Sequence, residues 1–527
     1  MDEKRKIFVS AFWVSLGTFI TRIVGLFREI AMAALFGTGI AADAFSVAFR
    51  FPNLFKILVG EGAFSAAFLP KFAEVKHREG NNAGFAMASG VLLATILLVI
   101  VISILGIIFA PQIIGFIVIG WQGDIARKTL AVKLVRVMFI MVTFTGLASY
   151  CQAILNAHHK FFVSAIAPAL LNFAWLAGIG IAAWGYVTEQ KQITIVAVAV
   201  VIGALLQFIW QFPWILKLGW RFTSQFRYRL KDLLEVGKLY IPILIALASN
   251  EFYYFADVIL GSFLKGGSVS SLAYANRLLY LPLGLIGFAI ATASLPGMAD
   301  SAARKDNENL ASLLSYSTRA TFTFLIPIAF AAITLRYEIV ALLFERGSFS
   351  ASSSTPMVAY ALLFYMIGLP FFGVQRALTQ GYYALKDTFT PVIVASVGMI
   401  INIETSMIFM LKLEHGGLAL GSSITGFCNT FMLLYYIKRI LPELNLKPII
   451  INILKVLSAS AITSCITYYS TLYINPLLDF NILILTRLLQ LVIPSAIFLI
   501  VFTAFSKIFK IDEVKHAYDN ILYKFRN

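Results

Sequence analysis

Residues 86–118 read AMASGVLLATILLVIVISILGIIFAPQIIGFIV, an apolar stretch without a single charged side chain. A helix needs about 20 predominantly apolar residues to cross the hydrocarbon core of a bilayer. This stretch is therefore expected to span a membrane, and the chain contains further stretches of the same kind, separated by short breaks rich in Gly, Pro, Asn and charge. The fourteen expected spans are residues 9–36, 43–70, 86–118, 130–156, 162–186, 193–216, 236–262, 269–297, 309–334, 356–384, 389–411, 417–437, 450–474 and 482–506.

The composition of the whole chain agrees with a membrane protein. Of its 527 residues, 60% are apolar and 13% are charged. Soluble domains are about half apolar and about a quarter charged, so a soluble protein is excluded. An outer-membrane barrel is also excluded, because its strands alternate between apolar and polar residues. We expect an all-α integral membrane protein with about 14 transmembrane helices.

The formal net charge of +16 has a topological explanation. In a soluble protein such a surplus would suggest nucleic acid, but cytoplasmic loops of membrane proteins collect Lys and Arg. With the N-terminus inside, the inner loops and tails hold about three times as many Lys and Arg as the outer loops. We therefore expect both termini in the cytoplasm and no nucleic-acid partner. The three cysteines lie in apolar stretches without Cys-x-x-Cys spacing, so neither a disulfide framework nor a metal site is expected.

The chain also carries a faint internal repeat. Gly62 and Leu69-Pro70, near the end of the second span, resemble Gly287 and Leu295-Pro296, near the end of the eighth. Six spans per repeat would make the two copies parallel, related by an axis along the membrane normal. We expect an N-terminal lobe at 1–225, a C-terminal lobe at 226–442, and an appended helix pair with a cytoplasmic tail at 443–527.

Charged residues within the first two spans need an explanation, because a cation at mid-membrane costs about 2.5–3.5 kcal/mol on the insertion scale. Arg22 and Glu29 are seven positions apart and lie on nearly the same helix face. At 100° per residue, Asp43, Arg50 and Glu61 fall within about 20° of one line. Such stripes predict an interior cavity. Its candidate residues are Arg22, Arg28, Glu29, Asp43, Arg50, Asn53, Lys56, Glu61 and Arg277.

Two interpretations of this set stay open. The charges could pair with one another and lock helices together, or they could line a wet, substrate-binding cavity. Cations outnumber anions in the set, so the cavity would be net positive and would suit an anionic headgroup. Arginine favours phosphate because its planar fork binds oxygens in pairs. The residues alone therefore predict a transporter for an anion or a phosphate.

A second polar set could bind a small cation. Asp257, Asn402 and Ser422 lie in spans 7, 11 and 12 and could supply oxygen ligands. The alternative is that Asp257 pairs with a cation or lines the cavity. The chain has no GxxxxGK[ST] loop, so it is not expected to be an ATP-driven transporter.

Several motifs resemble one known family. Residues 21–29 (TRIVGLFRE), 61–70 (EGAFSAAFLP) and 383–391 (YALKDTFTP) closely resemble the MurJ (MviN) lipid II flippases. These belong to the multidrug/oligosaccharidyl-lipid/polysaccharide exporter superfamily. The resemblance covers essentially the whole chain. It implies two six-helix lobes around a central cationic cavity, and a hydrophobic groove for a polyprenyl tail on the two extra C-terminal helices.

The resemblance also implies roles for individual residues. Arg22, Arg28 and Arg277 look like the family's cavity arginines, and Asp43 looks like its acid. Glu29 stands where the family often has Asp, which keeps the negative charge.

Other positions match the family or depart from it. Asn53 and Glu61 match, whereas Lys56 stands where many members have Arg and loses bidentate phosphate binding. Tyr280 stands where some members have Glu. For the sodium site of some members, Asp257, Asn402 and Ser422 look like counterparts, but Ser406 stands where an Asp ligand is expected.

We predict a multi-pass flippase of the bacterial cytoplasmic membrane that moves lipid II from the inner to the outer leaflet by alternating access, without covalent chemistry. No cofactor is expected; Na⁺ or H⁺ coupling, or the membrane potential, would drive the cycle. Expected partners are lipid II (undecaprenyl-pyrophosphate-linked disaccharide-pentapeptide), the membrane and the cell-wall synthesis machinery, and the protein is expected to be a monomer. The alternatives are a flippase for another polyprenyl-pyrophosphate-linked glycan and a cation-coupled exporter of the same fold.

Overall fold

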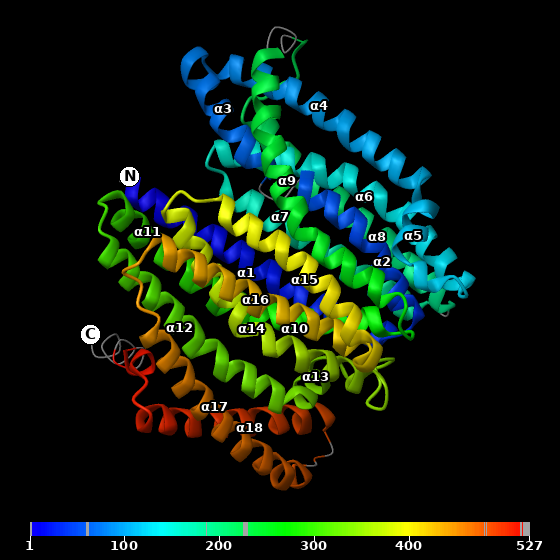
Figure 1. Ribbon diagram of the computed structural model, residues 1–527. Coiled ribbons are helices and arrows are strands. Elements are labelled where there is room, and N and C mark those ends of the chain that lie inside the picture. The colour runs from blue at the N-terminus through cyan, green and yellow to red at the C-terminus, as the bar shows by residue number, and fades with distance from the viewer. Residues whose placement is uncertain are drawn as a thin grey trace. The chain divides into compact units, whose positions relative to one another are not determined.

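The computed structural model describes residues 3–59, 63–185, 187–224, 230–478, 480, 482–516 and 519. Within these residues the regular elements are all helices (Figure 1). Eleven of the described helices are long and apolar enough to cross a membrane. The prediction of an all-α integral membrane protein is confirmed.

Most helix bounds lie within a few residues of the expected spans, but the span expected at 86–118 is divided at Phe109 into two helices, with a proline at the start of the second. The earlier helices are α1 Glu3–Phe36, α2 Ile40–Val59, α3 Ala63–Glu79, α4 Asn81–Ile108, α5 Ala110–Ile117, α6 Ile125–Ala157, α7 Phe161–Trp184, α8 Glu189–Lys217 and α9 Leu230–Gly261. The later helices are α10 Ser268–Pro282, α11 Phe288–Ala303, α12 Asn307–Thr334, α13 Arg336–Phe344, α14 Ser354–Ala384, α15 Phe389–Leu413, α16 His415–Ile440, α17 Lys447–Ile474 and α18 Leu483–Ile508.

Three expected spans correspond to helices outside those eleven, namely α1, α2 and α9. Helix α2 shows a reason, because its 20 residues include Asp43, Arg50 and Lys56. The second expected span, 43–70, is divided between α2 and α3. Helices α10 and α11 form one continuous span that is interrupted only by a π-helical turn at Leu283–Gly287.

The chain divides into two compact units. Unit 1 contains Met1–Ser270 with Arg346–Ser348, and unit 2 contains Ser271–Glu345 with Phe349–Asn527. The predicted lobe boundary at 225 differs from this division, because α9 packs on α2 and α3 of unit 1. The boundaries at 225 and 442 stay predictions.

The junction between α3 and α9 explains why α9 packs with unit 1. The buried ammonium group of Lys71 on α3 lies 2.6 Å from a carboxylate oxygen of Glu235 and 3.4 Å from one of Asp232. The hydroxyl of Tyr240 donates to the carbonyl of Leu58, the next-to-last residue of α2, at 2.8 Å. These contacts fix the first turns of α9 against unit 1.

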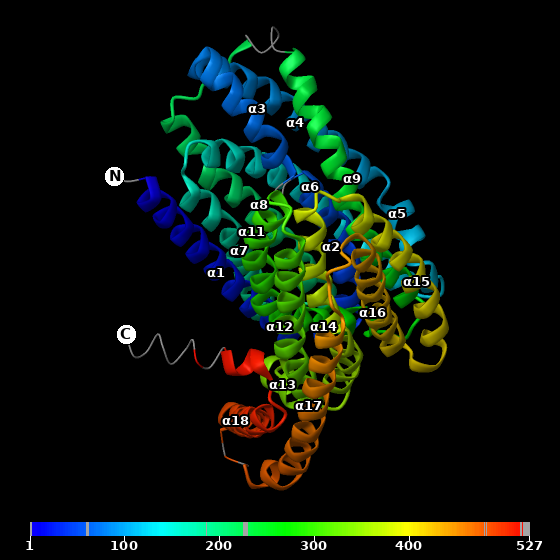
Figure 2. The same ribbon diagram turned by 60° about the vertical axis from the view of Figure 1, so that its left-hand side comes forward.

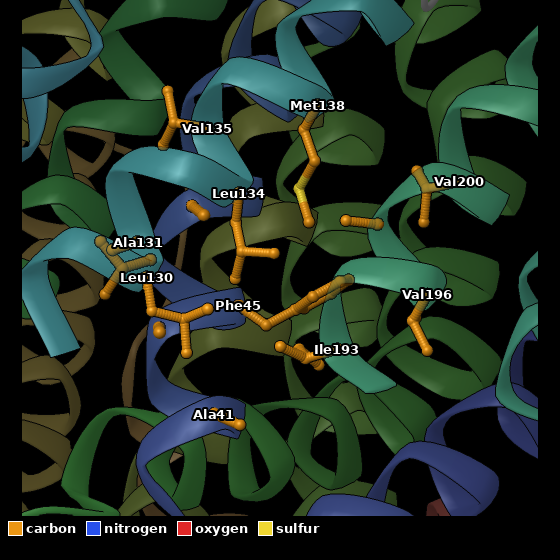
Figure 3. Close-up of a cluster of buried hydrophobic side chains, with 14 of the residues drawn as sticks. Ala41, Phe45, Leu130, Ala131, Leu134, Val135, Met138, Ile193, Val196 and Val200 are labelled. Carbon is orange, nitrogen blue, oxygen red and sulfur yellow. The ribbon is translucent and has the colours of Figure 1, made fainter. Parts of the chain in front are cut away.

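The core of unit 1 is formed by α2, α6, α7 and α8. Phe45 of α2 packs among Leu134 and Met138 of α6 and Val196 of α8 (Figure 3). Helices α1 and α7 also pack closely. A Cβ added at Gly17 of α1 would lie only 2.8 Å from the Cβ of a residue on α7, so a side chain there would force the helices apart.

In unit 2, α14 packs on α16 and on α12, and α15 packs on α16, as α6 packs on α8 and α4 and α7 packs on α8 in unit 1. The appended helix α17 packs on α12, and α18 lies beside α17 in both views (Figures 1 and 2). Among the described residues, α17 is joined to α12 by three polar contacts. They are the pair Thr323–Asn452, at 3.1 Å from the amide nitrogen to the hydroxyl, the pair Thr334–Ser464, and a hydrogen bond from the Ser464 hydroxyl to the Phe330 carbonyl at 3.3 Å.

The internal repeat is visible at matching helix ends. His159, after α6, and Lys386, after α14, are both non-glycine residues in the left-handed region, with φ of 58° and 61°. In both joints the next amide donates to a carbonyl five residues back, at 2.8 Å after His159 and 2.9 Å after Lys386. This is the capping pattern of a Schellman motif, and it also ends α11 at Lys305 and α18 at Lys510. The two copies after α6 and α14 agree with the repeat because they lie at equivalent places in the chain.

Candidate substrate-binding site

Most of the predicted cavity residues belong to unit 1. Arg277, Asn402 and Ser422 belong to unit 2, and Glu61 lies outside the described residues. The described candidates of unit 1 are Arg22, Arg28, Glu29, Asp43, Arg50, Asn53, Lys56 and Asp257.

Arg28 contacts two side chains of α7 and the adjacent carboxylate of Glu29. Its Nη1 donates to Oδ1 of Asn172 on α7 at 2.7 Å, and its Nη2 donates to Oε1 of the adjacent Glu29. The guanidinium carbon lies 4.2 Å from the ring centre of Trp175, also on α7. The side chains of Arg28 and Glu29 are 12% and 18% exposed, so the pair is mostly, but not fully, enclosed.

Asp43 lies in a different environment from the one predicted. Its side chain is fully buried, and its carboxylate accepts a hydrogen bond from Nη2 of Arg127 on α6. The same carboxylate accepts from the backbone amides of Gly267 and Ser270, at 2.8 and 2.7 Å. Asp43 thereby caps the first turn of α10, where backbone amides have no partner inside the helix. The guanidinium of Arg127 lies 3.9 Å from the ring centre of Trp121.

This arrangement favours the helix-joining interpretation for Asp43. Both carboxylate oxygens are engaged, and the whole group is removed from solvent. A substrate headgroup would have to displace buried partners to reach it. The assignment of Asp43 to the substrate cavity stays a prediction, and in this conformation the residue joins α2, α6 and the start of α10.

Asp257 of α9 is half-buried, and the positive charge of Arg50 on α2 attracts its carboxylate. Its Oδ1 is enclosed and accepts no hydrogen bond within the described part of the chain. The rings of Phe51 and Phe255 pack beside these two residues with centres 4.7 Å apart. Both predicted roles of Asp257, as a ligand of a small cation and as the partner of a cationic side chain, stay predictions.

The remaining candidates of unit 1 are more accessible. Arg22 on α1 is exposed, whereas Asn53 and Lys56 on α2 are half-buried. Pro52 lies inside α2 between Arg50 and Asn53, where it removes one helical hydrogen bond.

In unit 2, Arg277 is exposed on α10, six residues before the π-helical turn. Asn402 of α15 and Ser422 of α16 are brought together, with Nδ2 of the amide donating to the hydroxyl at 3.3 Å. Within the described part of the chain, Oδ1 of Asn402 and Oγ of Ser406 are buried and have no hydrogen-bond partner. These neutral oxygens could face a small cation, and the cation site stays a prediction.

Asn172, Trp175, Trp121 and Arg127 were not among the residues predicted from the sequence. A signal for Asn172 was available, because it is the only amide in the apolar run 161–184. Polar residues at membrane depth usually have a partner or a function.

Comparison with known proteins gives a consistent result. The family model "Lipid II flippase MurJ" matches residues 32–489. A probable lipid II flippase MurJ of Vibrio cholerae is 32% identical over 443 residues, which cover 81% of this chain and 82% of the relative. A solved structure of a lipid II flippase MurJ in an inward-closed conformation is similar with a TM-score of 0.77 at 28% identity, covering 94% of this chain and 98% of that chain.

A more distant solved structure shares the fold. It is an inward-facing multidrug resistance MATE family transporter of the MOP superfamily, with a TM-score of 0.67 at 14% identity, covering 82% of this chain and 98% of that chain.

Proposed function

The chain belongs to the MurJ family of lipid II flippases, and from this premise we propose that it moves lipid II from the inner to the outer leaflet of the bacterial cytoplasmic membrane. It is a transporter with many membrane-spanning helices, and its substrate is an amphiphile of the membrane itself. The observation that carries the proposal is the family match over 32–489, which includes the charged part of α2.

The chemistry of Arg28 supports this proposal. A diphosphate headgroup faces a cost of several kcal/mol or more in hydrocarbon unless polar partners accompany it. Arg28 offers a planar guanidinium that is held by Asn172 and Trp175, and such a fork binds phosphate oxygens in pairs. In this proposal Arg22 and Arg277 are further phosphate ligands, and Arg50, Asn53, Lys56 and Glu61 line the path of the headgroup.

The transport step is proposed to be alternating access without covalent chemistry. The headgroup crosses in the wet cavity while the polyprenyl chain stays in lipid beside α17 and α18. We place both termini in the cytoplasm, because this orientation puts most of the Lys and Arg residues of the loops and tails on the cytoplasmic side, where membrane proteins collect them. We expect a monomer that works beside the cell-wall synthesis machinery.

The proposed driving force is the membrane potential. A surplus positive charge in the cavity gains about 2.3 kcal/mol per 100 mV when it moves toward the negative side. Collapsing the potential in vesicles should therefore slow lipid II flipping, and an unchanged rate would exclude this source of energy. Replacing Na⁺ by K⁺ in the same vesicles tests the second source, a sodium site that would use Asn402 and Ser422.

Complementation tests the function itself. A bacterial host depleted of its own flippase would receive the wild-type chain or the Arg28→Ala variant, and outward exposure of lipid II would be followed. Rescue by the wild type and not by well-expressed Arg28→Ala would support both the substrate and the cationic site. Failure of the properly inserted wild type would favour another polyprenyl-pyrophosphate-linked glycan as the substrate.

A further inference from the structure

Two side chains of α7 contact the same cation of α1. Asn172 and Trp175 are three residues apart, so they lie on one face of the helix. The first accepts a hydrogen bond from Nη1 of Arg28 at 2.7 Å, and the ring of the second lies 4.2 Å from its guanidinium carbon. Both are buried, at 7% and 3% exposure. Asn172 therefore holds the guanidinium at one N–H edge, and the ring of Trp175 covers one of its planar faces.

The orientation of the Asn172 amide is itself fixed. Its Nδ2 donates to the backbone carbonyl of Thr21, two turns earlier on α1, at 3.3 Å. An amide carries its donor and acceptor on opposite branches, so the bond to Thr21 directs Oδ1 toward Arg28. A rotated amide would break this bond and point two N–H groups at a cation, which would be repulsive.

The position of Trp175 is fixed by other aromatic rings. Its centre lies 5.3 Å from that of Phe45 and 5.1 Å from that of Phe49, both on α2. Phe45 belongs to the packed core of unit 1 (Figure 3). The ring under Arg28 is thus built on the core rather than on a mobile surface.

We propose that Asn172 and Trp175 are positioning residues that hold the Arg28 guanidinium in the orientation that binds the substrate diphosphate. This inference rests on the proposed function and deepens it. An arginine side chain has many rotamers, and ordering it only when the ligand arrives would weaken binding. Asn172 and Trp175 meet this ordering requirement before the substrate binds.

A double-mutant cycle in proteoliposomes tests the proposal, with fluorescent lipid II as the probe. Flipping rate and lipid II affinity would be measured for the wild type, Asn172→Ala, Arg28→Ala and the double variant. If Asn172 acts through Arg28, the single change lowers affinity by about fivefold to tenfold, and the double variant is within about twofold of Arg28→Ala alone. Independent, multiplying effects would overturn the proposal, because they would mean that Asn172 supports the fold in some other way.

Trp175 offers a test by conservative replacement. Trp175→Phe keeps an aromatic face under the cation, whereas Trp175→Leu keeps only the apolar volume. We expect Trp175→Phe to stay within about threefold of the wild-type affinity and Trp175→Leu to lose about tenfold, in keeping with the range of cation–π interactions. Equal losses in the two variants would exclude the role of the ring face.

A matched control comes from another asparagine that packs against α7. Asn156, at the end of α6, accepts a hydrogen bond from the Ser164 hydroxyl of α7 at 2.7 Å, two turns of α7 before Asn172. Asn156→Ala should leave lipid II affinity unchanged, and a loss as large as that of Asn172→Ala would contradict the proposal. The wild-type flipping rate separates the proposed function from the positioning role. A wild type that does not flip lipid II refutes the proposed function. If the wild type flips lipid II and the effects of Asn172→Ala and Arg28→Ala are additive, only the positioning role fails.

Discussion

Two ion pairs of unit 1 use the same chemical groups in different ways. Arg28 and Glu29 are neighbours on one helix, are 12% and 18% exposed, and contact α7 through the arginine. Asp43 and Arg127 are 84 positions apart, are 0% and 6% exposed, and join α2 to α6. The first pair remains partly accessible, whereas the second is an internal joint. The two pairs therefore differ in how completely their partners enclose the charges.

The largest expected effect is loss of stability when the enclosed pair is broken. Asp43→Ala leaves the Arg127 guanidinium buried without its carboxylate and removes the cap from the amides of Gly267 and Ser270. Breaking a buried pair costs about 3–5 kcal/mol, so thermal unfolding in detergent should shift clearly downward. The double variant Asp43→Leu/Arg127→Met, which removes both charges, should recover part of the loss. An unchanged melting temperature for Asp43→Ala would show that the Asp43–Arg127 pair does not stabilise the fold, and would contradict its role as an internal joint.

A smaller, purely functional effect is expected at the other pair. Arg28→Lys keeps the charge but loses the planar fork that Asn172 and the diphosphate both use. Lipid II flipping should fall by about tenfold, with unfolding within about 1 kcal/mol of the wild type, because the pair is partly solvated. Reconstituted flipping and thermal unfolding of the same preparation measure both quantities. If Arg28→Lys lost much stability while its folded fraction flipped lipid II normally, Arg28 would support the fold and not substrate binding.

The smallest effect on stability is expected for Asp387, an acid outside the membrane-spanning helices that can be compared with the acids of the two ion pairs. Asp387, between α14 and α15, accepts from the amides of Phe389 and Thr390, each at 3.0 Å, and from the Thr390 hydroxyl. Burial raises the pKa of Asp387, but the hydrogen bonds from Thr390 and Phe389 outweigh it and leave a net lowering. Asp387→Ala should cost about 1 kcal/mol at pH 7, as for other lost helix caps.

The sign of its pH dependence follows from that lowering. A carboxyl with a lowered pKa stabilises the folded state above its unfolded pKa, about 3.9, and loses this contribution as the pH falls through the folded value. The stability difference between the wild type and Asp387→Ala should therefore shrink below about pH 4. Unfolding at pH 7 and pH 3.5 measures it, and a difference that grows in acid would contradict the capping role.

The sequence predicted the fold well, because twenty-residue apolar stretches have few alternatives in a bilayer. The stripe predicted for Arg22 and Glu29 stays a prediction, because Glu29 is mostly enclosed beside Arg28 whereas Arg22 is exposed. The sequence could not predict the partners of Asp43. One of them, Arg127, lies in the first turn of a different helix, α6, and the other two are backbone amides at Gly267 and Ser270. Backbone groups leave no trace in side-chain patterns, so an acid that caps a distant helix looks the same in sequence as an acid that faces a cavity.

The π-helical turn at Leu283–Gly287 has a consequence for the ancestry of this span. A π turn holds one residue more than an α turn, so it can absorb a single-residue insertion without breaking the helix. Deleting one residue within 283–287 should give an uninterrupted α-helix whose part after the turn is rotated by about 100° relative to Arg277. An alignment of relatives that differ by one residue in this span should place its gap here, and the two length classes would then present different faces of α11.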